Sequence, residues 1–143
     1  MPIPTFLENG YLPEGIHFTG LAEIEERFGK HTPRRKELFL RLKYFVELAH
    51  HCGALKMLIN GSFITAVDEP GDVDVVIRLD QYHEDMLAQG DLKAMELEIV
   101  FETRQPKDAF PAYYEDRWGE WVAFFTNVKG STTLHKGVLE IKP

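Results

Sequence analysis

The sequence predicts one small α/β (α+β) domain, residues 1–143, in which a mixed β-sheet is flanked by helices. Short runs rich in β-branched residues alternate with segments whose apolar residues recur every three or four positions, and this alternation indicates strands and helices in one chain. A length of 143 residues is enough for one domain with a core. Hydrophobic residues make up 44% and charged residues 27%, which is typical of a globular protein.

The sequence of the N-terminal third indicates an irregular arm followed by two helices. Frequent proline and glycine indicate that residues 1–18 form an irregular arm that packs on the domain. Thr19 can cap a first, short helix. Thr32 followed by Pro33 is a typical start for a longer helix, which we expect to end before Gly53.

The pattern of apolar residues in the remainder of the chain predicts four strands and two helices. Strands are expected at residues 55–59, 73–79, 96–102 and 138–141, and helices at residues 80–95 and 111–127. The strand at 96–102 is predicted from its strict alternation of apolar and other side chains. Glycine and proline between the first two strands predict a loop there.

Composition excludes several classes of protein. The formal net charge of −7 argues against a surface that binds nucleic acid through phosphate neutralisation alone. A single cysteine, Cys52, rules out an intrachain disulfide and fits a reducing cytoplasm. The N-terminus does not read as a signal peptide, and no stretch approaches the roughly 18 to 20 apolar residues that cross a bilayer. We therefore expect a cytoplasmic protein without a membrane partner.

Residues 58–76 carry the candidate chemistry. An apolar strand ends in Gly61-Ser62, nine residues follow, and Asp72-Val73-Asp74 then begins a second apolar strand. Aspartates at positions i and i+2 of a strand project from the same face, so their carboxylates can share one metal ion. Oxygen ligands of this kind suit Mg²⁺ or Mn²⁺.

The Gly-Ser pair supplies what a phosphate needs beside such a metal. Gly61 has no side chain, so its backbone can approach a phosphate closely, and Ser62 offers both a hydroxyl and an N–H. Transfer of a phosphoryl-type group depends mainly on positioning and charge neutralisation, which this set can supply. The alternative is a plain turn at Gly61-Ser62 with Asp72 and Asp74 exposed on an edge strand.

This segment resembles the motif of the DNA polymerase β-like nucleotidyltransferase superfamily, in which an apolar strand, Gly-Ser or Gly-Gly, a gap and an Asp-x-Asp or Asp-x-Glu unit follow one another. The matching positions are Gly61, Ser62, Asp72, Val73, Asp74 and Val75. Asn60 departs from the pattern, since many members have an apolar residue there. The similarity extends over residues 55–102. It implies a nucleotidyltransferase-like fold that binds a nucleotide and two metal ions.

Most of the chain also resembles a group of small bacterial proteins that is placed in this superfamily without an assigned reaction. The shared motifs are Pro-x-Pro-x-Phe-x-x-Asn-Gly-x-Leu-Pro-x-Gly-Ile-His, Arg-Arg-Lys/Arg-Glu-Leu, Gly-Ser-Phe-Ile/Val-Thr and Gly-Asp-Val-Asp-Val-Val. In this sequence they stand at residues 2–17, 34–38, 61–65 and 71–76.

The superfamily resemblance also implies a third carboxylate from a later strand. Glu96, Glu98 and Glu102 share one face of the strand expected at residues 96–102. Glu98 lies at its centre, so we predict Asp72, Asp74 and Glu98 as catalytic metal ligands. The alternative is that these glutamates are only the solvent face of an amphipathic strand.

Several other positions each allow two interpretations of their role. Thr65 can bind phosphate or cap the short helix after the Gly-Ser turn. Arg78 can bind phosphate or pair with an acidic side chain. Arg34, Arg35 and Lys36 begin the long helix, where cations oppose the helix dipole, and they either contact phosphate or nucleic acid or form a solvated face.

The predicted function is therefore a metal-dependent nucleotidyltransferase that moves a nucleoside monophosphate from an NTP to a hydroxyl acceptor and releases pyrophosphate. The acceptor is a protein, an RNA or a small molecule. The chain leaves little room for a second domain, which favours a protein partner or a homo-oligomer. The alternative is a catalytically degenerate binding module that acts with a protein partner, for which the resemblance implies a toxin–antitoxin or defence role. A third interpretation is a structural domain without a site.

Overall fold

The computed structural model describes residues 3–105, 108–131 and 133–143, and these form a mixed α/β fold, as the sequence predicts. The elements are β1 (Gly15–Phe18), α1 (Leu21–Phe28), α2 (Pro33–His51), β2 (Lys56–Asn60), a 3₁₀ turn η1 (Ser62–Ile64), β3 (Asp74–Arg78), α3 (Gln81–Ala88), α4 (Leu92–Thr103), β4 (Ala109–Ala112), α5 (Glu115–Thr126) and β5 (Gly137–Ile141).

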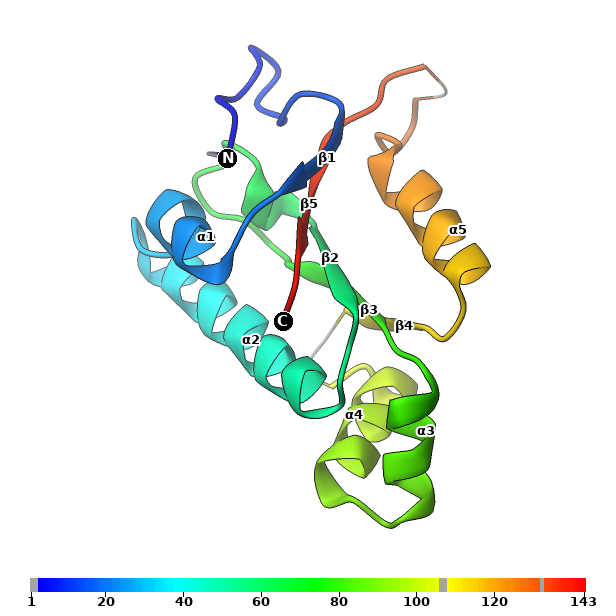
Figure 1. The fold of residues 1–143 in the computed structure, drawn as a ribbon. Coiled ribbons are helices and arrows are strands. Elements are labelled where there is room, and N and C mark those ends of the chain that lie inside the picture. Colours follow the sequence, from blue (N-terminus) through cyan, green and yellow to red (C-terminus); the bar gives the residue numbers. More distant parts are fainter. Residues whose placement is uncertain (1–2, 106–107, 132) are drawn as a thin grey trace.

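The five strands form one mixed sheet in the order β1-β5-β2-β3-β4 (Figure 1). β2 runs antiparallel to both of its neighbours, β3 and β5. The two edge strands pair parallel to the strands beside them, β1 to β5 and β4 to β3. Consequently β2, β3 and β5 are central, and β1 and β4 form the edges.

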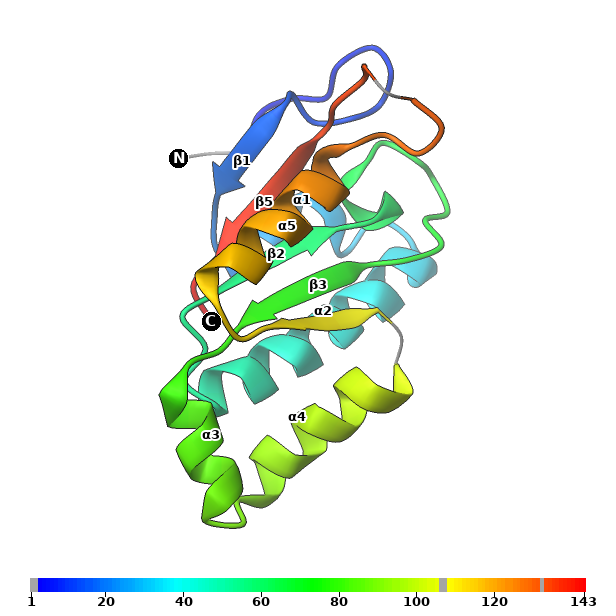
Figure 2. The same cartoon turned by 90° about the vertical axis from the view of Figure 1, so that its right-hand side faces the viewer.

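Helices cover both faces of this sheet, with α5 alone on one side and α2 on the other (Figure 2). Met57 and Ile59 of β2 belong to the larger core, which also contains buried side chains of α1, α2 and α4. Leu58, between them, belongs to a second core with Trp118 and Phe125 of α5. This alternation is the two-residue period of a strand, so the central strands are apolar on both faces.

The segment predicted as a strand at residues 96–102 is instead the second half of α4. Asp91 caps this helix by accepting the N–H of Ala94 at 2.8 Å. The side chains buried in α4 are those of Ala94, Leu97, Val100 and Phe101. Their spacing of three and four is helical, whereas Ile99, which strand alternation would bury, is 57% exposed. The prediction was wrong because the segment fits both periods and burial selects the helical one.

Both edge strands were missed in the sequence. Residues 15–18, predicted as part of an irregular arm, form β1, and residues 1–2 of that arm lie outside the described residues. β4 has only four residues and contains Pro111, which an edge strand tolerates because one side of its backbone needs no donor. The helix predicted to begin at residue 111 therefore begins at Glu115.

The cationic start of α2 holds the loop between β2 and β3. Arg35 is 7% exposed, and its guanidinium donates to the carbonyls of Phe63 at 2.7 Å, Thr65 at 2.8 Å and Val67 at 2.6 Å. Arg34 donates to the carbonyls of Pro70 at 2.9 Å and Gly71 at 2.7 Å. Both predicted readings, phosphate contact and a solvated face, are thus replaced by a structural role.

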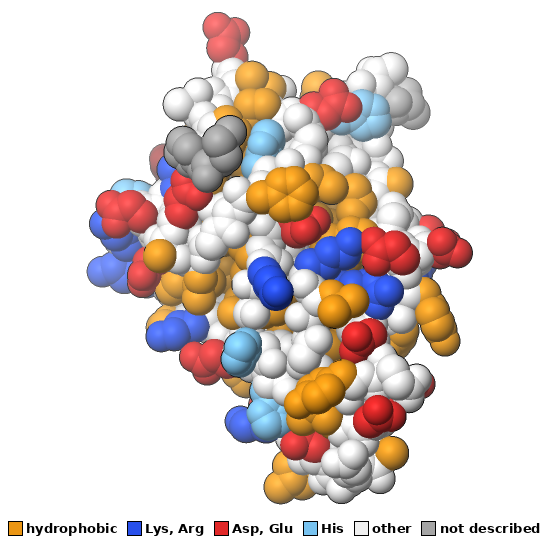
Figure 3. Space-filling model, in the orientation of Figure 1, with side chains coloured by type: hydrophobic (Ala, Val, Ile, Leu, Met, Phe, Trp, Pro, Cys, Tyr) orange, Lys and Arg blue, Asp and Glu red, His pale blue; other side chains and the backbone are white. Residues whose placement is uncertain are grey.

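Charged side chains of both signs lie on the face of the molecule shown in Figure 3. They are interspersed there with apolar side chains. Across residues 3–105, 108–131 and 133–143, no helix combines the length and the apolar character needed to cross a membrane.

Replacing Arg35 by Met is expected to lower the free energy of unfolding by about 3 kcal/mol, because the carbonyls that the guanidinium binds lose their donor in a buried place. The unfolding temperature should fall by about 10 °C. Lys36→Met is the matched control, since Lys36 is the next residue on the helix and is exposed. Equal unfolding temperatures for the two variants in a calorimetric scan would contradict the role given to Arg35.

Candidate functional site

Three carboxylates meet at the start of β3. Asp72, Asp74 and Asp108 each offer a carboxylate oxygen, and these oxygens lie within 4.8 Å of one another. Asp108 immediately precedes β4, which pairs parallel to β3 with Ala109 opposite Val75. The N–H of Val75 donates to the Asp108 carbonyl at 2.8 Å. Strand pairing therefore brings Asp108 beside Asp74 although 34 residues separate them in the sequence.

Gly61 allows the end of β2 to lie against the start of β3. Its φ is +95°, in the region that favours glycine. A Cβ at this position would lie 2.9 Å from the Asp72 carbonyl oxygen and 3.1 Å from the Asp74 nitrogen. The side chain is thus excluded by protein backbone, so the need for glycine here follows from the fold itself and not only from a phosphate.

Ser62 fixes the Asp72 carboxylate. Its N–H and its hydroxyl both donate to Asp72 Oδ1, at 2.8 Å and 2.7 Å. The hydroxyl oxygen in turn accepts the N–H of Gly71 at 2.9 Å. The role that these bonds give Ser62 is to position a carboxylate, whereas the sequence predicts direct phosphate contact.

The surroundings shift the pKa values of Asp72 and Asp74 in opposite directions. Burial alone would raise the pKa of Asp72, but the hydrogen bonds from Ser62 outweigh it and hold that pKa below its usual value. Burial, followed by the charges of Asp72 and Asp108, raises the pKa of Asp74 to about 8. Negative charge is therefore in excess at this point, and a bound cation would relieve it.

A pocket of about 730 Å³ opens beside the carboxylates. Gly61, Ser62, Thr65, Asp72 and Asp74 line one part of it, so five of the predicted site residues share one cavity. The aromatic residues Tyr11, Phe124 and Phe125 also line it. Its size lies in the range of pockets that bind ligands as large as a nucleotide.

Asn60 stands in the wall of this pocket with an unused acceptor. It is paired with Asp74 across β2 and β3, and its side chain is 3% exposed. Its amide nitrogen donates to the Phe125 carbonyl at 3.3 Å, while its amide oxygen finds no partner among the described residues. A buried unpaired carbonyl next to a pocket is suited to accept a hydrogen bond from a ligand.

Glu98 does not join the carboxylate cluster. It projects from α4 and accepts hydrogen bonds from His83 Nε2 at 2.9 Å and from the Tyr113 hydroxyl at 2.7 Å. It lines a separate pocket with Arg104 and Trp121. The structure thus contradicts the prediction of Glu98 as third ligand, because that prediction depended on a strand at residues 96–102.

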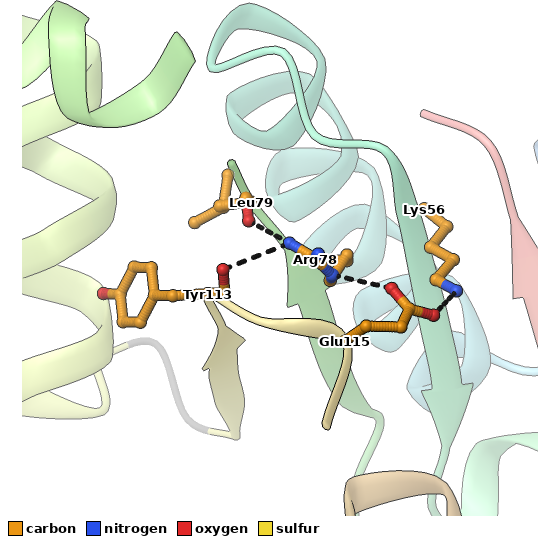
Figure 4. A network of polar contacts seen from close by, with 5 residues as sticks. All are labelled: Lys56, Arg78, Leu79, Tyr113 and Glu115. Carbon is orange, nitrogen blue, oxygen red and sulfur yellow. Dashed lines mark hydrogen bonds and ion pairs between the residues drawn. The ribbon is translucent and has the colours of Figure 1, made fainter. Parts of the chain in front are cut away.

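Arg78 also lies away from the pocket. It shares β3 with Asp74 but sits four residues further along, a rise of about 13 Å. There Arg78 Nε binds Glu115 at 3.0 Å, and Glu115 binds Lys56 at 2.6 Å (Figure 4). Arg78 therefore pairs with an acidic side chain, which is one of the two interpretations that the sequence allows.

Thr65 lies at the pocket but serves the turn. Its hydroxyl donates to the Ser62 carbonyl at 2.7 Å and accepts the N–H of Val67 at 3.3 Å. Thr65 therefore caps η1, as one of the two interpretations predicts. It does so at the C-terminal end of η1, whereas threonine usually caps the N-terminal end of a helix.

Two residues of this site were missed in the sequence. Asp108 stands just before a four-residue apolar strand, and that position is the only local signal for it. Lys136 lines the pocket and is half-buried. Burial lowers the Lys136 pKa, and the charges of Asp74 and Asp72 oppose that shift. Nothing near Lys136 in the sequence marks it, since it precedes β5, far along the chain from the motif.

Fold and site together define a small α/β domain with a three-aspartate cluster, two members of which, Asp72 and Asp74, line a pocket. The chain belongs to a family of unknown function (DUF6932), whose match covers residues 4–142. No curated protein and no solved structure matches the chain significantly.

Asp74→Asn is expected to stabilise the metal-free protein at pH 8. The pKa of Asp74 is raised from 3.8 to about 8 in the folded protein. Below pH 4 the carboxyl is neutral in both states and its burial costs no stability. As the pH rises from 4 to 8, the unfolded state loses its proton first, so the free energy of unfolding falls. Asparagine stays neutral and removes that loss. In EDTA, the variant should unfold several degrees above the wild type at pH 8 and at the same temperature near pH 4. A difference that does not change with pH would contradict this account.

Proposed function

We propose that this protein is a metal-dependent nucleotidyltransferase that moves a nucleoside monophosphate from an NTP to a hydroxyl acceptor. The observation that carries the proposal is the convergence of Asp72, Asp74 and Asp108, of which Asp72 and Asp74 line a pocket of about 730 Å³. The resemblance of Gly61-Ser62 and Asp72-Val73-Asp74 to the polymerase β-like superfamily supports it. In this proposal, Asp108 takes the role that the sequence assigns to Glu98.

The donor set fits Mg²⁺ or Mn²⁺. It consists of carboxylate oxygens alone, within 4.8 Å of one another, and hard divalent cations prefer such ligands. Burial, followed by the charges of Asp72 and Asp108, raises the pKa of Asp74, and a cation bound to these carboxylates would balance those charges. Asp72, Asp74 and Asp108 would hold the metal, which would supply charge neutralisation for the triphosphate and activate the acceptor hydroxyl.

The surrounding residues orient the reactants. Ser62 keeps the Asp72 carboxylate in one position through two hydrogen bonds. The aromatic part of the pocket offers Phe124 and Phe125 as surfaces on which a base can stack. The bond from the α-phosphorus to the bridging oxygen breaks, pyrophosphate leaves, and the acceptor oxygen takes its place after losing its proton.

The acceptor in this proposal is a protein, an RNA or a small molecule, and a protein partner or a second copy of the chain would help to bind it. NTPs and free Mg²⁺ are abundant in the cytoplasm, so the proposed reaction places the protein there.

A catalytically degenerate binding module is the second candidate. It is favoured by one observation: both donors of Ser62 are already used by Asp72, which leaves neither for a phosphate. Such a module would keep the pocket, bind metal weakly and act through a protein partner of the toxin–antitoxin or defence type.

Calorimetric titration with Mn²⁺ or Mg²⁺ and each NTP tests the proposal. The wild type should bind an NTP only with metal, and a double variant Asp72→Ala, Asp74→Ala should lose this binding. Asp108→Asn should weaken metal binding on the order of tenfold, because one charged ligand is lost. Glu98→Gln is the control and should leave metal binding unchanged. A folded wild type that binds no NTP with either metal would support the binding module.

A further inference from the structure

Lys136 is held rigidly at the edge of the carboxylate pocket. Its backbone N–H donates to the Thr126 carbonyl at 2.8 Å, and the next N–H, of Gly137, donates to the Leu12 carbonyl at 3.0 Å. These bonds tie the chain between the end of α5 and the start of β5. The side chain is half-buried and lines the same pocket as Asp72 and Asp74.

The ammonium group is near the carboxylates without being paired with them. The charges of Asp74 and Asp72 both act on it. Within the described part of the chain, however, no acidic oxygen lies within the 4.0 Å of an ion pair with Lys136, and its Nζ lies 5.9 Å from the centre of the Tyr11 ring. A space therefore separates one positive charge from a group of negative ones.

The charge balance of this space changes when a divalent cation binds. Two lysines, Lys129 and Lys136, line the pocket, and without metal Lys136 is the half-buried one whose charge acts on Asp72 and Asp74. With metal on the carboxylates, the ammonium faces another cation across a short gap, and the two repel. An anion between them removes the repulsion, and a lysine is well suited to bind phosphate as a compact point charge.

We propose that Lys136 has two successive roles: it is the counter-ion of the carboxylates in the metal-free protein, and it binds a phosphate group of the metal-bound polyphosphate. The inference rests on the proposed function, since it names the polyphosphate ligand of the same site. It makes Lys136 a competitor of the metal ion and a partner of the phosphate.

The two roles predict effects of opposite sign for one substitution. Lys136→Met keeps an unbranched side chain that is one atom shorter, and it removes the ammonium group with its charge. Affinity for Mn²⁺ alone should rise by about three- to tenfold, because a competing cation is gone. Affinity for tripolyphosphate and for NTP at saturating Mn²⁺ should fall by about ten- to a hundredfold, because a charge-assisted hydrogen bond is lost. Lys136→Arg should bind Mn²⁺ like the wild type and keep most of the phosphate binding.

The experiment measures Mn²⁺ binding by electron paramagnetic resonance and polyphosphate binding by calorimetry. Lys93→Met is the matched control: the same change of net charge on a side chain that is 60% exposed on α4. It should change neither affinity. Weaker binding of both Mn²⁺ and tripolyphosphate by Lys136→Met would show a merely structural role and overturn the inference. Unchanged affinities would overturn it too.

The tripolyphosphate measurement separates this inference from the proposed reaction. Lys136-dependent binding of tripolyphosphate, together with failure to bind any NTP, would uphold the phosphate site and overturn the nucleotidyltransferase. Absence of tripolyphosphate binding by the metal-loaded wild type would overturn the role of Lys136 in binding phosphate.

Discussion

The close contact between Gly61 and the backbone of Asp72 and Asp74 is the constraint on which the site depends. Two antiparallel strands that are joined by a long loop would normally diverge at their ends. Here a residue with positive φ and no side chain lets the end of β2 touch the start of β3, so Ser62 reaches the Asp72 carboxylate. The same contact leaves Asn60 and Asp74 side by side beneath the pocket.

The loop that this contact closes is held from the opposite side by α2. A buried guanidinium is expensive to desolvate, and it is tolerated at Arg35 because backbone carbonyls surround it. These hydrogen bonds of Arg35 hold η1 and the residues that follow it, while the neighbouring Arg34 holds the last residues before Asp72. The position of the Asp72 carboxylate therefore depends on the conformation of the loop, and that conformation depends on the packing of α2.

Local patterns in the sequence predicted the parts of the site that lie close together in the chain. Asp72 and Asp74 were found because their spacing is a property of one strand, and the central strands were found because both of their faces are apolar. Asp108 could not be found in this way, since its place depends on the pairing of a four-residue edge strand with β3. The choice of Glu98 failed for a different reason: residues 96–102 satisfy two periodicities, and only the packing of α4 on the core distinguishes them.

The division of the acidic cluster between two strands has a consequence for how often it is complete. Asp72 and Asp74 are two residues apart at the start of a central strand, so they move together. Asp108 is joined to them through β4, which has a neighbouring strand on one side alone and is otherwise held by packing, with Ala109 in the larger core and Ala112 in the second. Local opening of an edge strand requires less free energy than global unfolding. Local opening of β4 would remove the third carboxylate and leave the other two in place, so any contact that covers this edge of the sheet would favour the complete cluster.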